Sequence, residues 1–277
     1  MLERVRRKAV DVWERRRPLP HTRYVPDTPK VGTESGLTVH FPPNPPTLAA
    51  AALSFEAADF VMGVLKKLTP DEEVENQSFY YQWGRAKFGG HWRWADIATT
   101  LRAAALFVRP QRYLEIGVRR GRSAAIVAAT CPGCDVYGFD LWEGAYAGAE
   151  NPGPDLVRKE LSAVGHTGEV TLVAGDSART VPEFLDTHPE LFFELVTVDG
   201  DHSVLGAARD LTNALPRLKV GGILVFDDIC SAPLLQSVWQ RIVQRDRRFV
   251  TWEFTDAGYG VAAAIRISDA PVIMGTS

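Results

Sequence analysis

The chain has 277 residues, of which 45% are hydrophobic and 23% charged, so it can build a sizeable core and is not of the globally disordered class. A net charge of −3 and a pI of about 6.1 argue against a nucleic-acid-binding protein. No apolar run approaches the roughly 20 residues that span a bilayer, and the start, MLERVRRKAV, lacks the apolar core of a secretory signal. We therefore expect a soluble cytoplasmic protein.

Residues 1–47 are predicted to be a basic helix followed by a proline-rich arm. Residues 1–17 contain seven Lys or Arg against three acids, with apolar residues at helical spacing. Such a helix can lie on a membrane surface, but packing on its own domain or on a neighbouring subunit is the preferred interpretation. Eight prolines between Pro18 and Pro46 indicate an extended arm.

Residues 48–108 are predicted to form a helical cap. The helical stretches are LAAAALSFEAADFVMGVLKKL, a segment around SFYYQWGRAKFGGHWRW, and ADIATTLRAAALFV. The aromatic residues and histidine between 80 and 94 suit either a small aromatic core or a lid over a substrate pocket. On the second interpretation, Tyr80, Trp83 and His91 are candidate substrate-binding residues.

Residues 109–277 are predicted to be an α/β domain. From Arg112 onward, short apolar runs alternate with helix-length segments, and the order βαβαβ indicates a parallel sheet with helices on both faces. The last two strands are joined by a short TDAG turn, which indicates an antiparallel hairpin. The expected strands are RYLEI (112–116), VYGFD (136–140), VTLVA (170–174), LVTVD (195–199), GILVFD (222–227), FVTWEFT (249–255) and GVAAAIRI (260–267).

Polar residues and glycines follow the first three strands, at the edge where parallel sheets bind ligands. Glu115 ends the first strand and is followed by a GxxxG turn, which lets backbone approach a ligand closely. Asp140 ends the second strand and suits a ribose diol. After the third strand, Asp176 could contact an adenine amino group or cap the next helix. The cofactor-site candidates are Glu115, Gly117, Gly121, Ser123, Asp140, Trp142, Asp176 and Ser177.

The motifs EIGVRRGRS, YGFD, AGDS, VDGDHS and LKVGGILVFDD resemble those of class I S-adenosylmethionine-dependent methyltransferases, over about Arg112 to Ile267. VDGDHS and GGILVFDD resemble the branch of metal-dependent sugar O-methyltransferases of macrolide and aminocoumarin antibiotic pathways. The resemblance implies a seven-stranded Rossmann-like sheet, mostly parallel with the last strand antiparallel. It places the cofactor over the first three strands and the substrate over the fourth and fifth.

By the same resemblance, Glu115 would face the methionine ammonium group and Asp140 the ribose hydroxyls. Gly117, Gly121 and Ser123 would form the turn, and Asp176 and Ser177 would lie near the adenine. The first loop departs from the G-x-G that family members often carry, because Arg119 and Arg120 precede Gly121.

Adjacent fourth and fifth strands would bring Asp199, Asp227 and Asp228 together. Three clustered carboxylates repel one another unless they are protonated or bridged by a cation, and oxygen ligands suit Mg²⁺ or another divalent ion. The alternative is that these acids cap helices and pair with Arg209 or Lys219. A bound cation can lower the pKa of one hydroxyl of a diol and aim it. Because the DGD sequence resembles that of the related sugar enzymes, Asp201 is the first candidate for the base that removes the proton; His202, with the more suitable unperturbed pKa, is the second.

Three functions remain open at this point. The first is a Mg²⁺-dependent O-methyltransferase acting on a vicinal diol of a sugar or glycosylated metabolite. The second is a methyltransferase with the same cofactor whose substrate is a catechol or phenol. The third is a cofactor-binding scaffold protein without turnover that uses residues 1–46 to join subunits. A dehydrogenase is less favoured because GxGxxG is absent. A homo-oligomer and a small-molecule hydroxyl substrate are expected.

The three cysteines fit a reduced compartment. Cys131 and Cys134 form CPGC, which could be a redox pair or half a zinc site. No second pair follows, and Pro-Gly is expected in a turn between a helix and a strand. A structural turn is therefore the preferred interpretation.

Overall fold

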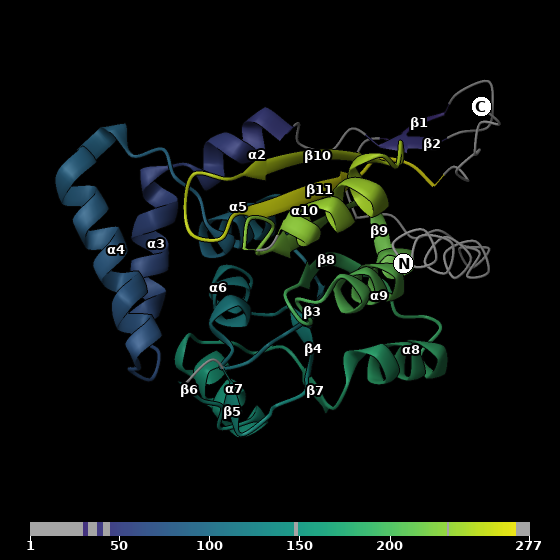
Figure 1. Cartoon of the computed structure of the whole chain (residues 1–277), viewed down its shortest axis with the longest axis horizontal. Coiled ribbons are helices and arrows are strands. Elements are labelled where there is room, and N and C mark those ends of the chain that lie inside the picture. Colours follow the sequence, from purple (N-terminus) through teal and green to yellow (C-terminus); the bar gives the residue numbers. More distant parts are fainter. Residues whose placement is uncertain (1–29, 33–37, 41–44, 147–148, 232, 270–277) are drawn as a thin grey trace.

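The computed structural model describes residues 30–32, 38–40, 45–146, 149–231 and 233–269 (Figure 1). The predicted basic helix at 1–17 lies outside these residues. Of the proline-rich arm, the structure describes two short strands, β1 (Lys30–Gly32) and β2 (Thr38–His40), which pair antiparallel, and the residues at 45–46 that begin the first helix.

A seven-stranded sheet in the order β10-β11-β9-β8-β3-β4-β7 forms the centre of the fold. The strands are β3 (Arg112–Ile116), β4 (Asp135–Asp140), β7 (Val170–Ala174), β8 (Phe193–Val198), β9 (Leu218–Asp227), β10 (Phe249–Phe254) and β11 (Val261–Arg266). Neighbours pair in parallel except β11, which is antiparallel to β10 and β9. The predicted Rossmann-like sheet with an antiparallel last strand is confirmed. β5 (Ala145–Tyr146) and β6 (Ala149–Glu150) form a separate small hairpin.

The sheet register sets the functional edge. β3 lies between β8 and β4, so the chain order changes direction at β3 and leaves a ligand crevice at its carboxyl end. Ile116 is opposite Val198 in β8, and Val198 is opposite Phe226 in β9. The residues that directly follow these three positions therefore emerge at one edge of the sheet.

Helices cover both faces of the sheet, and each face has its own buried hydrophobic core. In Figure 1, α2, α3, α5 and α6 lie on one side and α8, α9 and α10 on the other. The helices are α2 (Pro45–Ala52), α3 (Phe55–Leu65), α4 (Glu72–Phe88), η1 (Gly89–His91), α5 (Ile97–Val108), α6 (Arg122–Thr130), α7 (Pro154–Ala163), α8 (Ser177–Thr187), α9 (Val204–Ala214), η2 (Leu215–Arg217), α10 (Pro233–Trp239) and the π-helical η3 (Gln240–Gln244). Both faces of the sheet are thus covered, which explains why all six residues of β8 are buried.

The cap segment is helical as predicted, but its first helix is divided. The run at 48–68 breaks into α2 and α3 at Ser54, whose hydroxyl accepts a hydrogen bond from the Ala57 N–H at 3.1 Å and caps α3. α4 lies at the outer side of the molecule (Figure 1). Within the described residues no single helix has the length and apolar character to cross a membrane, although α2 and α3, bent at Ser54, pass that test as a pair.

The aromatic residues of the cap form the small core that was one of the two predictions. Tyr81 and Trp92 are fully buried, and the Tyr80 ring packs edge-on against both, with centroids 5.4 Å apart in each case. Gly84 makes this packing possible, because a Cβ there would lie 1.8 Å from the Trp92 ring. The aromatic cluster therefore fixes α4 to the segment that leads into α5.

Candidate active site

Glu115, at the end of β3, is a buried carboxyl group with one unsatisfied oxygen. Its Oε1 accepts a hydrogen bond from the Ser123 hydroxyl, whereas its Oε2 has no hydrogen-bond donor among the described residues. The nearby Tyr113 hydroxyl donates to Thr197 Oγ1 at 2.8 Å. Burial raises the pKa of Glu115 to about 8. A buried acceptor of this kind is suited to an ammonium group.

The loop from Gly117 to Gly121, here called the cofactor loop, connects Glu115 to α6. Gly117 has a φ of +91°, and a Cβ there would lie 1.9 Å from the Asp199 carbonyl oxygen. Gly121 has a φ of +81° and caps α6. Glycine at both positions therefore lets the loop turn sharply and lie against the end of β8, beside the predicted cation site.

Asp140, at the end of β4, is held by two backbone groups. Its Oδ2 accepts from the Arg119 N–H at 2.7 Å and its Oδ1 from the Trp142 N–H at 2.6 Å. The Trp142 indole donates to the Arg119 carbonyl at 3.0 Å. Each carboxylate oxygen keeps a second lone pair, so this acid is oriented and can still accept hydrogen bonds from a diol.

The two cofactor-site candidates that follow β7, Asp176 and Ser177, have contacts within the protein. Asp176 is exposed and caps α8, since its carboxylate accepts from the Ala178 N–H at 2.9 Å. The Ser177 hydroxyl donates to Asp210 Oδ1 at 2.7 Å. The capping role foreseen for Asp176 is confirmed, and its contact with an adenine stays a prediction.

The acidic residues that follow β8 and β9 converge at the same sheet edge. Asp199, His202 and Asp228 each offer one ligand atom, and these atoms lie within 4.8 Å of one another. His202 Nε2 is 3.2 Å from Asp228 Oδ2 and 3.6 Å from Asp199 Oδ1. Asp228 has a φ of +60°, a conformation that few non-glycine residues adopt and that often marks functional sites.

Asp227 lies beside this group without belonging to it. Burial and the charges of Asp199 and Asp228 raise the pKa of Asp227 well above its usual value. Burial also raises the pKa of Asp199 and of Asp228, and the hydrogen bond to Asp199 raises the pKa of His202. The acids thus destabilise one another's charged forms, which a divalent cation would relieve.

The sequence offered Lys219 and Arg209 as alternative ion-pair partners for the acids at 199, 227 and 228. Lys219 pairs with the buried Glu194, and Arg209 is exposed. Two carboxylates and an imidazole form a donor set that fits Mn²⁺ or Fe²⁺, and a third carboxylate from Asp227 would make it fit Mg²⁺.

The two candidate bases point in different directions. Asp201 Oδ1 accepts from the Ser203 N–H at 2.8 Å, and a Cβ at Gly206 would lie 1.8 Å from Asp201 Oδ2. The Asp201 carboxylate therefore lies against the start of α9, whereas the His202 imidazole lies among the acids.

Sequence reasoning missed Asp96, which lies near the acidic group. Asp96 caps α5 in a capping box with Thr99, accepts a hydrogen bond from the Tyr81 hydroxyl at 2.6 Å, and contributes to the raised pKa of Asp227. The Asp-x-x-Thr spacing could have predicted the cap. Its position near Asp227 follows only from the fold.

Tyr80, Trp83 and His91 lie on α4 and η1. Tyr80 belongs to the aromatic core, and Trp83, 47% exposed, packs against Phe88 with ring centroids 6.0 Å apart. His91 is exposed in η1. The substrate role of these three residues stays a prediction.

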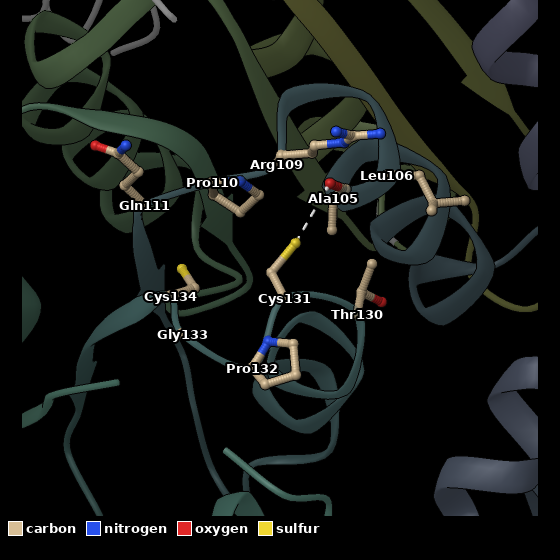
Figure 2. Close-up of a pocket in the computed structure, with 10 residues that line it drawn as sticks. All are labelled: Ala105, Leu106, Arg109, Pro110, Gln111, Thr130, Cys131, Pro132, Gly133 and Cys134. Carbon is tan, nitrogen blue, oxygen red and sulfur yellow. Dashed lines mark hydrogen bonds between the residues drawn. The ribbon is translucent and has the colours of Figure 1, made fainter. Parts of the chain in front are cut away.

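The CPGC segment lies at the opposite edge of the sheet. It lines a hollow of about 340 Å³ between the ends of α5 and α6 (Figure 2). The Cys134 N–H donates to the Cys131 carbonyl at 3.0 Å, which closes the predicted turn, and both thiols are free. Burial raises the pKa of each, so neither is an activated thiolate.

Comparison with known proteins finds a matching domain family and similar folds. Residues 114–229 match the family described as "Methyltransferase domain". No curated protein matches the sequence. A solved structure described as CalS11, calicheamicin methyltransferase, is 21% identical, with a TM-score of 0.50 over 76% of this chain and 91% of that one.

Two further structures are similar. An apo structure of CalS11, described as a TDP-rhamnose 3′-O-methyltransferase of calicheamicin biosynthesis, is 20% identical, with a TM-score of 0.50 over 76% of this chain and 93% of that one. The O-methyltransferase TomG from Streptomyces achromogenes, described as involved in tomaymycin synthesis and in complex with SAM, is 18% identical. Its TM-score is 0.52 over 72% of this chain and 91% of that one.

Residues 114–229 thus match a methyltransferase-domain family, and the central sheet has the Rossmann-like fold of the similar structures.

Proposed function

We propose that this protein is an O-methyltransferase that uses S-adenosylmethionine and a divalent cation, in the first place Mg²⁺, to methylate one hydroxyl of a vicinal diol on a sugar or glycosylated metabolite. The observation that carries the proposal is the close approach of two sites at one sheet edge. The unsatisfied carboxyl of Glu115 and the acidic group at Asp199 are bridged by the cofactor loop, which packs on Asp199 at Gly117. Two of the similar structures are described as O-methyltransferases, one of them acting on TDP-rhamnose, which supports the proposal of an O-methyltransferase.

Residues at and after the carboxyl ends of β3, β4 and β7 would bind the cofactor, which supplies an electrophilic methyl group. Glu115 would accept the ammonium group, and Asp140, already oriented by the Arg119 and Trp142 N–H groups, the ribose hydroxyls. The remaining members of the proposed set are Gly117, Gly121 and Ser123 in the turn, with Asp176 and Ser177 near the adenine.

Asp199, Asp227 and Asp228 would hold the cation, which lowers the pKa of a bound hydroxyl and orients it. We assign His202 as the base, because its imidazole lies among these acids while the Asp201 carboxylate is turned toward α9. Three carboxylates remain for the cation when His202 takes the proton. This assignment reverses the preference for Asp201 that the sequence alone favoured.

The test is methyl transfer from S-adenosylmethionine to a panel of deoxysugar nucleotides, simple glycosides and catechols, with Mg²⁺, Mn²⁺ or a chelator. We expect cation-dependent turnover on a diol-bearing sugar. His202→Gln should lower kcat by about 100-fold or more, as for loss of a general base, and Asp201→Asn should stay close to the wild type.

Each alternative has its own outcome. Turnover on catechols alone would support the phenol reading. Binding of S-adenosylhomocysteine without turnover on any acceptor would support the scaffold reading. Full turnover in the presence of the chelator would show that no cation is required. Full turnover by His202→Gln would show that His202 is not the base.

A further inference from the structure

We propose that Glu73, in the first turn of α4, is a positioning residue for the cofactor loop: it anchors Arg119, and through Arg119 it orients Asp140 for cofactor binding. This inference rests on the proposed function, because the ligand concerned is the cofactor. Sequence reasoning gave neither Glu73 nor Arg119 a role.

The start of α4 is tied to the cofactor loop and to the first residue of α6 by ion pairs. Glu73 Oε1 lies 2.7 Å from Arg119 Nη1, and the other oxygen of Glu73 pairs with Arg122. Asp71, just before α4, lies 2.6 Å from Arg120 Nε. The three arginine side chains are between 12% and 25% exposed, so water screens these pairs less than it screens ordinary surface pairs.

Arg119 is the residue of the loop on which Asp140 depends most directly. Its N–H donates to Asp140 and its carbonyl accepts from the Trp142 indole. It does this with a φ of +50°, a left-handed conformation that is strained for a non-glycine residue. An anchor on the Arg119 side chain offsets that strain and keeps both backbone groups in place.

α4 provides a firm support for this anchor. Asp71 caps the helix through the Val74 N–H at 2.7 Å, and Trp92 packs against Gly84 near the other end. The Thr69 N–H, just before α4, donates to both carboxylate oxygens of Glu160 on α7, at 3.1 and 3.0 Å. The Tyr81 hydroxyl donates to Asp96, so α4 contacts both the cofactor loop and a carboxylate whose charge contributes to the raised pKa of Asp227.

The test is calorimetric titration of S-adenosylhomocysteine into the wild type, Glu73→Gln and the matched control Glu72→Gln. Glu72 precedes Glu73 on the same helix and is exposed, so its substitution makes the same change of charge without touching the loop. Glu73→Gln should weaken binding by about tenfold, within the range of long-range couplings. Glu72→Gln should bind like the wild type, and both variants should melt close to the wild type.

A double-mutant cycle separates positioning from general stabilisation. If Glu73 acts through Arg119, then Glu73→Gln should weaken binding little further in an Arg119→Met background. Additive losses would overturn the proposed route. The salt dependence of binding is a second readout, because salt screens the ion pair between Glu73 and Arg119. Raising the salt from about 0.05 to about 0.5 M should weaken cofactor binding by the wild type more than binding by Glu73→Gln, which lacks this pair.

Unchanged affinity of Glu73→Gln, with normal binding by the wild type, would overturn this inference alone. Absence of binding by the wild type would overturn the proposed function and this inference with it.

Discussion

Glu115 is the residue whose ionisation a bound cofactor should change most. Its pKa of about 8 keeps much of this carboxyl group protonated at neutral pH. Because the neutral form is favoured in the fold, the resulting stability is fully present below the unfolded pKa and is lost as the pH rises through about 8. An ammonium group against the unsatisfied Oε2 would favour the ionised form instead.

We therefore predict that S-adenosylhomocysteine binding releases a proton from Glu115 and strengthens as the pH rises toward about 8. Calorimetry at neutral pH in two buffers with different ionisation enthalpies measures the released proton. Glu115→Gln should bind more weakly and lose this part of the proton release. Equal proton release by the wild type and Glu115→Gln would refute the assignment.

At the scale of elements, the position of α4 depends on one glycine. A Cβ at Gly84 would overlap the Trp92 ring, so we predict that Gly84→Ala destabilises the protein by about 1–3 kcal/mol, as overpacking does. Gly63→Ala in α3 is the matched control, because a Cβ there meets nothing within 4 Å; it should be neutral or stabilising by up to about 1 kcal/mol. Chemical denaturation measures both, and equal effects would contradict the packing argument.

The elements that could be predicted are those with a strong local pattern. All seven strands of the central sheet were found, because each is a short apolar run bounded by turn residues. β9 begins at Leu218, earlier than predicted, because Leu218 pairs with Phe193 of β8. α4 was only loosely located, because its large aromatic residues are not confined to the buried face: Tyr81 is buried, whereas Phe79 and Trp83 are 67% and 47% exposed.

At the scale of the whole molecule, parallel-sheet topology explains why strand-end residues could be predicted as site residues. Glu115, Asp140, Asp199 and Asp228 all emerge at one edge. The contacts that refine the site could not be predicted, because they join distant segments. The pair between Glu73 and Arg119 and the hydrogen bond from Arg119 to Asp140 depend on how the cap and the strands pack.

The most direct test of the central claim, that this edge binds S-adenosylmethionine beside a cation site, is calorimetric titration of the cofactor into the wild type and Asp140→Ala, each with Mg²⁺ and with a chelator. We predict that the wild type binds in both buffers and that Asp140→Ala binds at least about tenfold more weakly, since hydrogen bonds to a charged group are lost. No binding by the wild type in either buffer would contradict it. The acids after β8 and β9 would then have to be explained by their contacts within the protein.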